Sequence, residues 1–200
     1  MGFSSQPSVR FILASASPRR HELLGRMGIS FEPAPVNVEE WEDSPDGPEV
    51  LVRHNASLKA RAAARLFPDA VVLGSDTTVV LGGQILNKPA DLAQARDMLR
   101  ALAGRTHTVH TAVCLIEPGG ERCEVVRSGV TFKPFGDAVI DHYFSIVNPL
   151  DKAGAYGIQA GRELIIEKVD GSVDNVMGLP TEFLEKMLRE QGLWDCLKTQ

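Results

Sequence analysis

Two adjacent arginines, Arg19 and Arg20, stand where a helix is expected to begin. The apolar run 11–14 is typical of a buried strand, and Ser17, just before a proline, suits a helix N-cap. Cations are unfavourable at this end of a helix, because its free N–H groups already carry positive partial charge. A bound phosphate would reverse the effect, since it could accept hydrogen bonds from the N–H groups, from both guanidinium groups and from the hydroxyls of Ser15 and Ser17. The alternative is a pair of solvated surface arginines.

A carboxylate interrupts the long apolar run 71–81. Asp76 lies at its centre, and a buried aspartate is rare unless it is paired or bound to a metal. Gly82 and Gly83 predict a tight hairpin turn, after which the returning segment brings Lys88 close to Asp76. Lys88 could pair with Asp76 or contact a phosphate beside it. Alternatively, Asp76 is a capped or salt-bridged residue with a structural role.

Three other segments carry further charged candidates. Glu39 and Glu40 belong to an acidic run, although such runs are usually solvated loops. Lys59 lies on a helix predicted over 49–67, and its pattern alone is that of an ordinary exposed lysine. The glycine-punctuated loop 148–161 has the length of a functional loop. Several cations with one or two carboxylates suit a polyphosphate held with a divalent metal, which predicts a hydrolase or transferase acting on a phosphorylated small molecule.

The elements that must position these residues alternate between strand and helix at first and are rich in strands later. This order predicts an α/β fold with a mixed sheet. We expect the helix over 49–67 to line the core with Val50, Leu51, Leu58, Ala62 and Leu66. His107 and His110 lie three apart on a predicted strand and so face opposite sides, which argues against a metal pair. The other elements are helices over 18–27, 93–103, 137–147 and 181–191, and strands over 11–14, 71–81, 84–87, 107–116, 124–132 and 164–169.

The composition describes a globular protein with free thiols. Of the 200 residues, 44% are hydrophobic, and the net charge of −5 gives no general attraction to nucleic acid or to anionic membranes. Three cysteines without metal-binding spacing favour a reducing compartment. No stretch has the length and apolarity of a membrane span or a signal peptide. We therefore expect a cytoplasmic protein with a flexible tail over 1–8 and a single domain over 9–195.

Six short motifs together resemble the Maf family of nucleoside triphosphate pyrophosphatases, in order and at family spacing. They are Ser15–Arg20, Gly74–Thr77, Lys88-Pro89, Gly104–His107, Asp151–Gln159 and Gly178–Pro180. The resemblance covers about residues 11–191. It implies an elongated fold with two lobes around a central cleft, similar to the inosine triphosphatases. It also implies hydrolysis of a nucleoside triphosphate to the monophosphate and pyrophosphate, and a possible homodimer.

The same resemblance implies a substrate class. Family members that act on dTTP and UTP are similar to this chain at Arg19, Thr77 and Gln159, whereas the 7-methyl-GTP branch differs there. The resemblance therefore implies dTTP and UTP as substrates, with Gln159 and Thr77 contacting the pyrimidine. Two positions depart from the family pattern: Asn37, where some relatives carry an acid, and Ala160, where glycine is usual.

Matching positions also imply roles in the reaction. Asp76 would accept a proton from the attacking water, and Glu40 with Asp76 would hold Mg²⁺ or Mn²⁺. The phosphate contacts would be Ser15, Ser17, Arg19, Arg20, Lys59 and Lys88. A nucleotide-binding regulator without hydrolysis is the main alternative, since a binder needs the cations but not the base. A purely structural domain would leave the arginine pair unexplained.

Overall fold

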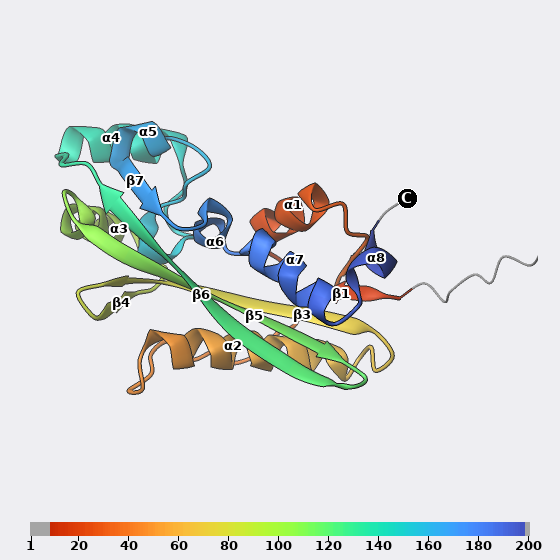
Figure 1. Ribbon diagram of the computed structural model, residues 1–200. Coiled ribbons are helices and arrows are strands. Elements are labelled where there is room, and N and C mark those ends of the chain that lie inside the picture. Colours follow the sequence, from red (N-terminus) through yellow and green to blue (C-terminus); the bar gives the residue numbers. More distant parts are fainter. Residues whose placement is uncertain (1–8, 199–200) are drawn as a thin grey trace, which may run out of the picture.

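Seven strands of the described residues form one twisted, mixed sheet (Figure 1). The computed structural model describes residues 9–198, so the predicted tail over 1–8 lies outside the described residues. The sheet order is β2-β1-β3-β5-β6-β7, with β4 paired to β3. Strand β1 pairs in parallel with β2 and β3, and the other pairs are antiparallel. The strands are β1 Phe11–Leu13, β2 Glu32–Pro33, β3 Val71–Leu81, β4 Gln84–Leu86, β5 Thr106–Glu117, β6 Gly120–Phe132 and β7 Ile166–Asp170.

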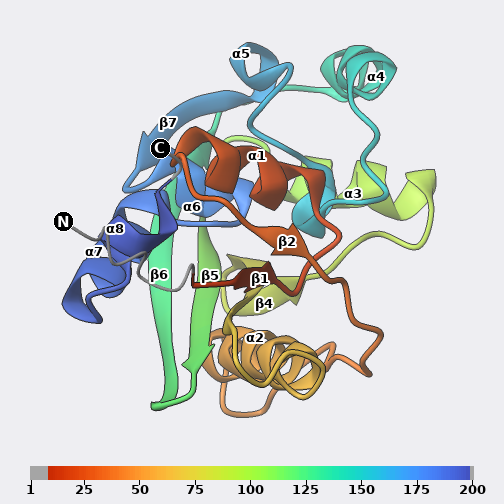
Figure 2. The same cartoon turned by 90° about the vertical axis from the view of Figure 1, so that its right-hand side faces the viewer.

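The helices divide between the two faces of this sheet. Helix α2 covers one face, whereas α1, α6, α7 and α8 lie over the other (Figures 1 and 2). Helices α3, α4 and α5 gather with β7 at one end, and the long strands β5 and β6 run through both ends. The helices are α1 Pro18–Arg26, α2 Pro48–Ala64, α3 Leu92–Leu102, α4 Asp137–Ile146, α5 Arg162–Ile165, α6 Val173–Met177, α7 Thr181–Glu190 and α8 Trp194–Leu197, with a 3₁₀ turn at Ala153–Ala155.

Helix α2 packs unusually close to the sheet because small residues face it. Ala56, Ala60 and Ala63 are fully buried, and a Cβ at Gly74 of β3 would lie 2.2 Å from the carbonyl oxygen of Ala56. The predicted inner face was therefore wrong in part, since Val50 is 39% exposed and Leu66, beyond the helix end, is 68% exposed. The close approach sets the polar residues of α2 against the middle of β3.

We expect Gly74→Ala to destabilise the protein by about 3 kcal/mol, because the added methyl group must push α2 away from β3. The free energy of unfolding from urea denaturation measures this. Gly119→Ala is the matched control, since a Cβ there meets no atom within 4 Å. Equal stability of the two variants would contradict the close packing.

Short elements account for most differences from the predicted pattern. Leu164 and Ile165 belong to α5, so β7 begins two residues later than the predicted strand. Helix α6 has five residues, begins after the N-cap Ser172 and ends at Gly178, which has a φ of 110°. Helices of one turn are too short to show a 3.6-residue hydrophobic period, and so the sequence pattern missed them.

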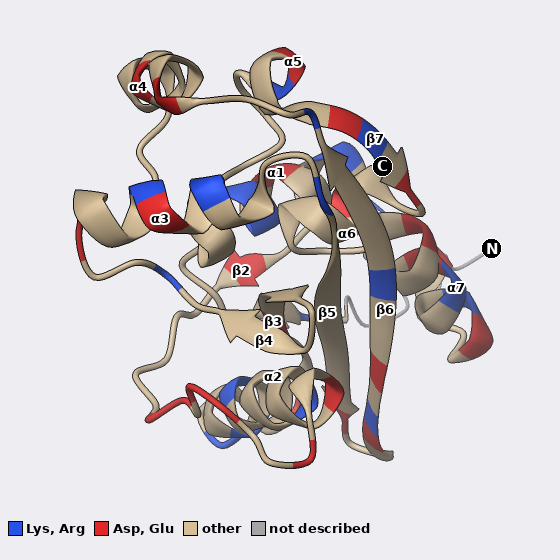
Figure 3. Ribbon diagram, turned by 90° about the vertical axis from the view of Figure 1, so that its left-hand side faces the viewer, with Lys and Arg blue, Asp and Glu red and all other residues tan. Residues whose placement is uncertain are grey.

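The surface mixes charges of both signs. Acidic and basic residues alternate along α3, β6 and α7 (Figure 3). Several form ion pairs, among them Arg100 with Asp137 and Arg122 with Glu190. Within residues 9–198, none of the helices combines the length and the apolar character that crossing a bilayer requires.

Candidate active site

A cavity of about 620 Å³ opens beside the start of α1. Its walls come from the β1–α1 junction, the segment 35–42, α2, the middle of β3, and the loop 151–158. A cavity of this size suits a small-molecule ligand such as a nucleotide. It brings together nine of the ten predicted site residues: Ser15, Ser17, Arg19, Arg20, Glu40, Lys59, Asp76, Thr77 and Lys88.

Two carboxylates converge on the ammonium group of Lys59. Its Nζ lies 2.8 Å from Oδ1 of Asp76 and also contacts Oε2 of Glu40. The side chains of Lys59 and Asp76 are only 12% and 15% exposed, so the exposed lysine predicted from the pattern alone is wrong. The hairpin pairing ends at Leu86, before Lys88, and the ion-pair partner of Asp76 comes from α2.

Arg20 ties three segments together. Its guanidinium donates to the carbonyl of Gly178 at 2.9 Å, and to the hydroxyls of Ser15 and Thr77 at 3.2 Å each. Burial lowers the pKa of Arg20, although the nearby carboxylate of Asp76 opposes the effect. The group keeps its charge, because arginine does not deprotonate in proteins. The hydroxyl of Thr77 is thus engaged with Arg20, and it also lies 3.1 Å from the hydroxyl of Thr111.

Arg19 faces the loop on the other side of the cavity. Its Nη1 lies 3.7 Å from Oδ2 of Asp151, a distance that leaves the guanidinium free to turn toward a ligand. Partial burial would raise the pKa of Asp151, but hydrogen bonding to Lys152 and the charge of Arg19 lower it overall.

Gln159 lies apart from the other predicted residues. It is exposed, its amide donates to Oε2 of Glu22 at 2.7 Å, and it lines a separate cavity of about 210 Å³ with Ala160. The loop has a positive φ at Gly154 (67°) and Ala155 (64°), and the next three residues, Tyr156, Gly157 and Ile158, line the larger cavity.

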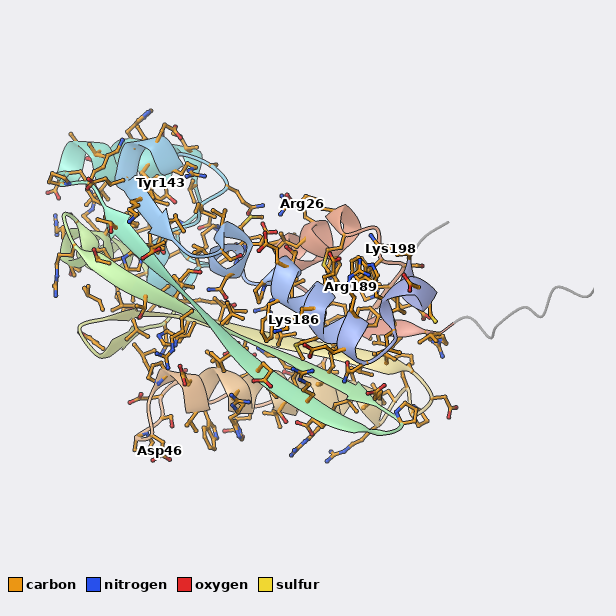
Figure 4. The ribbon with its side chains drawn as sticks, in the orientation of Figure 1. Arg26, Asp46, Tyr143, Lys186, Arg189 and Lys198 are labelled. Atoms are coloured by element: carbon orange, nitrogen blue, oxygen red, sulfur yellow. The ribbon has the colours of Figure 1, made fainter. Side chains whose placement is uncertain are left out.

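Two tyrosines that sequence reasoning did not single out fix this loop. The hydroxyl of Tyr143, on α4 (Figure 4), accepts from the N–H of Gly157 at 2.9 Å and donates to its carbonyl at 3.0 Å. Burial raises the pKa of Tyr143 to about 12. The hydroxyl of Tyr156 lies 2.7 Å from Nε2 of His107 on β5. Nothing in the sequence around Tyr143 on α4 or Tyr156 in the loop indicates these hydrogen bonds.

Burial also makes His107 a source of acid sensitivity, because it lowers the pKa of this residue from 6.5 to about 4. Below pH 6.5 His107 is protonated in the unfolded chain but stays neutral in the folded protein. The free energy of unfolding therefore falls as the pH drops toward 4. We expect His107 to cost about 2 kcal/mol of unfolding free energy at about pH 5. Urea denaturation at about pH 7.5 and 5 measures this, and His107→Gln should flatten the dependence. An equally steep loss in the variant would contradict it.

Two carboxylates of the cavity could share a divalent cation with the phosphates of a substrate. Glu40 lines the cavity with Asp76, whereas Glu39 does not, and the ammonium of Lys59 lies between their carboxylates. No group of three or more His, Cys, Asp or Glu residues in the described part of the chain could hold a metal alone. Mg²⁺ commonly takes one or two carboxylates together with phosphate oxygens and waters, which matches this set.

Comparison with known proteins shows which family this chain resembles. The family described as "Maf-like protein" matches residues 10–191. A dTTP/UTP pyrophosphatase of Syntrophus aciditrophicus is 44% identical over 185 residues, covering 92% of this chain and 90% of the relative. A dTTP/UTP pyrophosphatase of Deinococcus radiodurans is 43% identical over 189 residues, covering 94% and 96%.

A solved structure supports the fold. The Ham1 protein of Staphylococcus aureus matches with a TM-score of 0.52, covering 91% of this chain and 99% of that one. At 15% identity the likeness concerns the fold alone, and it confirms the predicted mixed-sheet α/β architecture. The match of the family over nearly the whole described chain, with relatives above 40% identity, shows that the chain belongs to the Maf family.

Proposed function

We propose that this chain hydrolyses dTTP and UTP between the α- and β-phosphates, with Asp76 as the general base. That it is a nucleoside triphosphate pyrophosphatase follows from its family and its relatives. The observation that carries the rest is the juxtaposition of Asp76 with cations in one cavity: Lys59 bonded to it, and Arg19 and Lys88 on the surrounding walls.

The residues divide between proton transfer and charge stabilisation. Asp76 takes a proton from the water that attacks the α-phosphorus, a step that a positioned carboxylate accelerates. Arg19, Lys88 and Lys59 stabilise the negative charge that builds up on the departing pyrophosphate. Glu40 and Asp76 would hold Mg²⁺ or Mn²⁺, which when bound supplies positive charge next to the phosphate oxygens. Ser15 and Ser17 line the cavity at the α1 N-terminus, where N–H groups favour an anion.

The pyrimidine is assigned to the loop side of the cavity, against Tyr156, Gly157 and Ile158. Thr77 would contact the pyrimidine while its hydroxyl still accepts a hydrogen bond from Arg20. Gln159 would first have to leave Glu22, so its expected contact with the base requires a rearrangement of the loop.

Pyrophosphate release from a panel of nucleoside triphosphates, with and without Mg²⁺ or Mn²⁺, tests this proposal. We expect dTTP and UTP to react fastest, to yield pyrophosphate rather than orthophosphate, and to require the metal. Faster hydrolysis of purine triphosphates would contradict the substrate assignment. Nucleotide binding without product from any substrate would favour the regulator instead.

The remaining expectations stay predictions. They are a homodimer, a cytoplasmic location, no nucleic-acid or membrane partner, and a single domain over 9–195. The described cysteines are free thiols, as a reducing compartment would keep them.

A further inference from the structure

The segment that carries Glu40 has little structure of its own. Residues 34–47 connect β2 to α2 without helix or strand. In the described part of the chain, the hydrogen bonds and ion pairs that join residues 35–43 to other elements come from Asn55, Lys59 and Asn87. The position of Glu40 at the cavity therefore depends on a few side chains.

Asn55 makes two of these attachments, both to the peptide groups of Trp41. Its Oδ1 accepts from the backbone N–H of Trp41 at 2.9 Å, and its Nδ2 donates to the carbonyl of Trp41 at 3.0 Å. The amide thus pairs with the peptide groups of Trp41 as a neighbouring strand would. The same Nδ2 donates to Oδ2 of Asp76 at 3.2 Å. These partners use both amide hydrogens, and a flipped amide would set Oδ1 against two acceptor oxygens.

Asn55 is also the buried polar residue on the inner face of α2. It is 3% exposed, and the close packing of α2 on β3 fixes its distance from Asp76. A buried amide whose hydrogen bonds all go to one loop and one carboxylate is held rigidly. Any movement would break hydrogen bonds that water cannot easily replace at a buried site.

We propose that Asn55 is a positioning residue: its amide binds both the peptide of Trp41 and the carboxylate of Asp76, and so holds the Glu40–Trp41 segment at a fixed distance from Asp76. Without it the two carboxylates lose their fixed separation, and the side of the cavity formed by residues 35–42 loosens. This inference rests on the proposed roles of Asp76 and Glu40 in the reaction. Misplacement of reacting groups by about 1 Å can cost about 10²-fold in rate.

Trp41 supplies a readout that does not depend on catalysis. Its ring stacks on that of His54, with centroids 3.5 Å apart and planes 9° from parallel. Because Asn55 holds the peptide of Trp41, releasing that peptide should separate the two rings. Trp194 is the other tryptophan of the chain. All proteins in the experiment therefore carry Trp194→Phe, so that the fluorescence reports on Trp41 alone.

The experiment compares Asn55→Ala and Asn55→Asp with Ser57→Ala as the matched control. Ser57 lies on the same helix but donates to Glu121 on β6, outside the cavity. We measure kcat and KM for dTTP with Mg²⁺, Trp41 anisotropy, and thermal unfolding. Asn55→Ala should lose about 10²-fold in kcat with KM nearly unchanged, and Trp41 anisotropy should fall. Asn55→Asp keeps the shape and one acceptor but loses both donations, so it should lose at least as much kcat and also free Trp41.

Unchanged Trp41 anisotropy in both variants, or kcat within twofold of the Ser57→Ala control, would overturn the proposal. Asn55→Asp preserves the volume of the side chain, so it provides the comparison if Asn55→Ala does not fold. Failure of the proposed reaction is distinguishable, since an active Asp76→Asn enzyme would remove Asp76 as the base while the Trp41 signal still reports the attachment by Asn55.

Discussion

Replacing Asp76 with asparagine should lower pyrophosphate release by about 10²–10⁴-fold, the range that a general base contributes. The amide is nearly the same size as the carboxylate but cannot take the proton of the attacking water. Lys59 would keep Glu40 as an anionic partner, and the new amide N–H₂ would face either Lys59 or Asn55, which needs only a local adjustment of these side chains. The fold should therefore survive while catalysis is lost.

The measurement is single-substrate kinetics with dTTP, together with the thermal unfolding of both proteins. Asp46→Asn is the control, because it makes the same chemical change on an exposed turn before α2 (Figure 4) and Asp46 is not among the residues that line the cavity. Asp46→Asn should match the unchanged enzyme. Turnover by a folded Asp76→Asn variant at a comparable rate would assign the base to another group.

The start of the site could be predicted because its signals are local. Ser17 occupies the N-cap position and Pro18 the first helical position of α1, as expected, and the two arginines follow at the cavity. The long run around Asp76 and the Gly82-Gly83 turn likewise form the predicted hairpin. In each case a few consecutive residues determine the backbone.

The pairing of side chains could not be predicted, because it depends on how elements pack. Lys59 reaches Asp76 because alanines and Gly74 let α2 approach β3, and a hydrophobic pattern that favours large residues does not reveal this. Asn55 was overlooked for the same reason, since a lone asparagine among alanines resembles a surface position. The bond of Gln159 to Glu22 could not be predicted either, because it depends on how the loop, with a positive φ at Ala155, packs against α1.

Lys59→Met should lower kcat/KM by about 10²-fold or more, a loss comparable to that of removing one charge-stabilising donor. Methionine fills much of the same space but leaves Asp76 and Glu40 facing each other without the cation that both contact. Lys59→Arg should restore only part of the activity, since a planar guanidinium does not place its charge where the compact ammonium does.

A loss of activity through general destabilisation has a different signature. Lys186→Met makes the same substitution on α7 at a 67% exposed side chain (Figure 4), and it should leave both kinetics and unfolding unchanged. If Lys59 acts at the site, Lys59→Arg should recover thermal stability more completely than it recovers kcat/KM. Parallel recovery of both would mean that Lys59 only joins α2 to β3. Activity of Lys59→Met close to that of Lys186→Met would exclude the ammonium from the reaction and leave Arg19 and Lys88 to stabilise the phosphate charge.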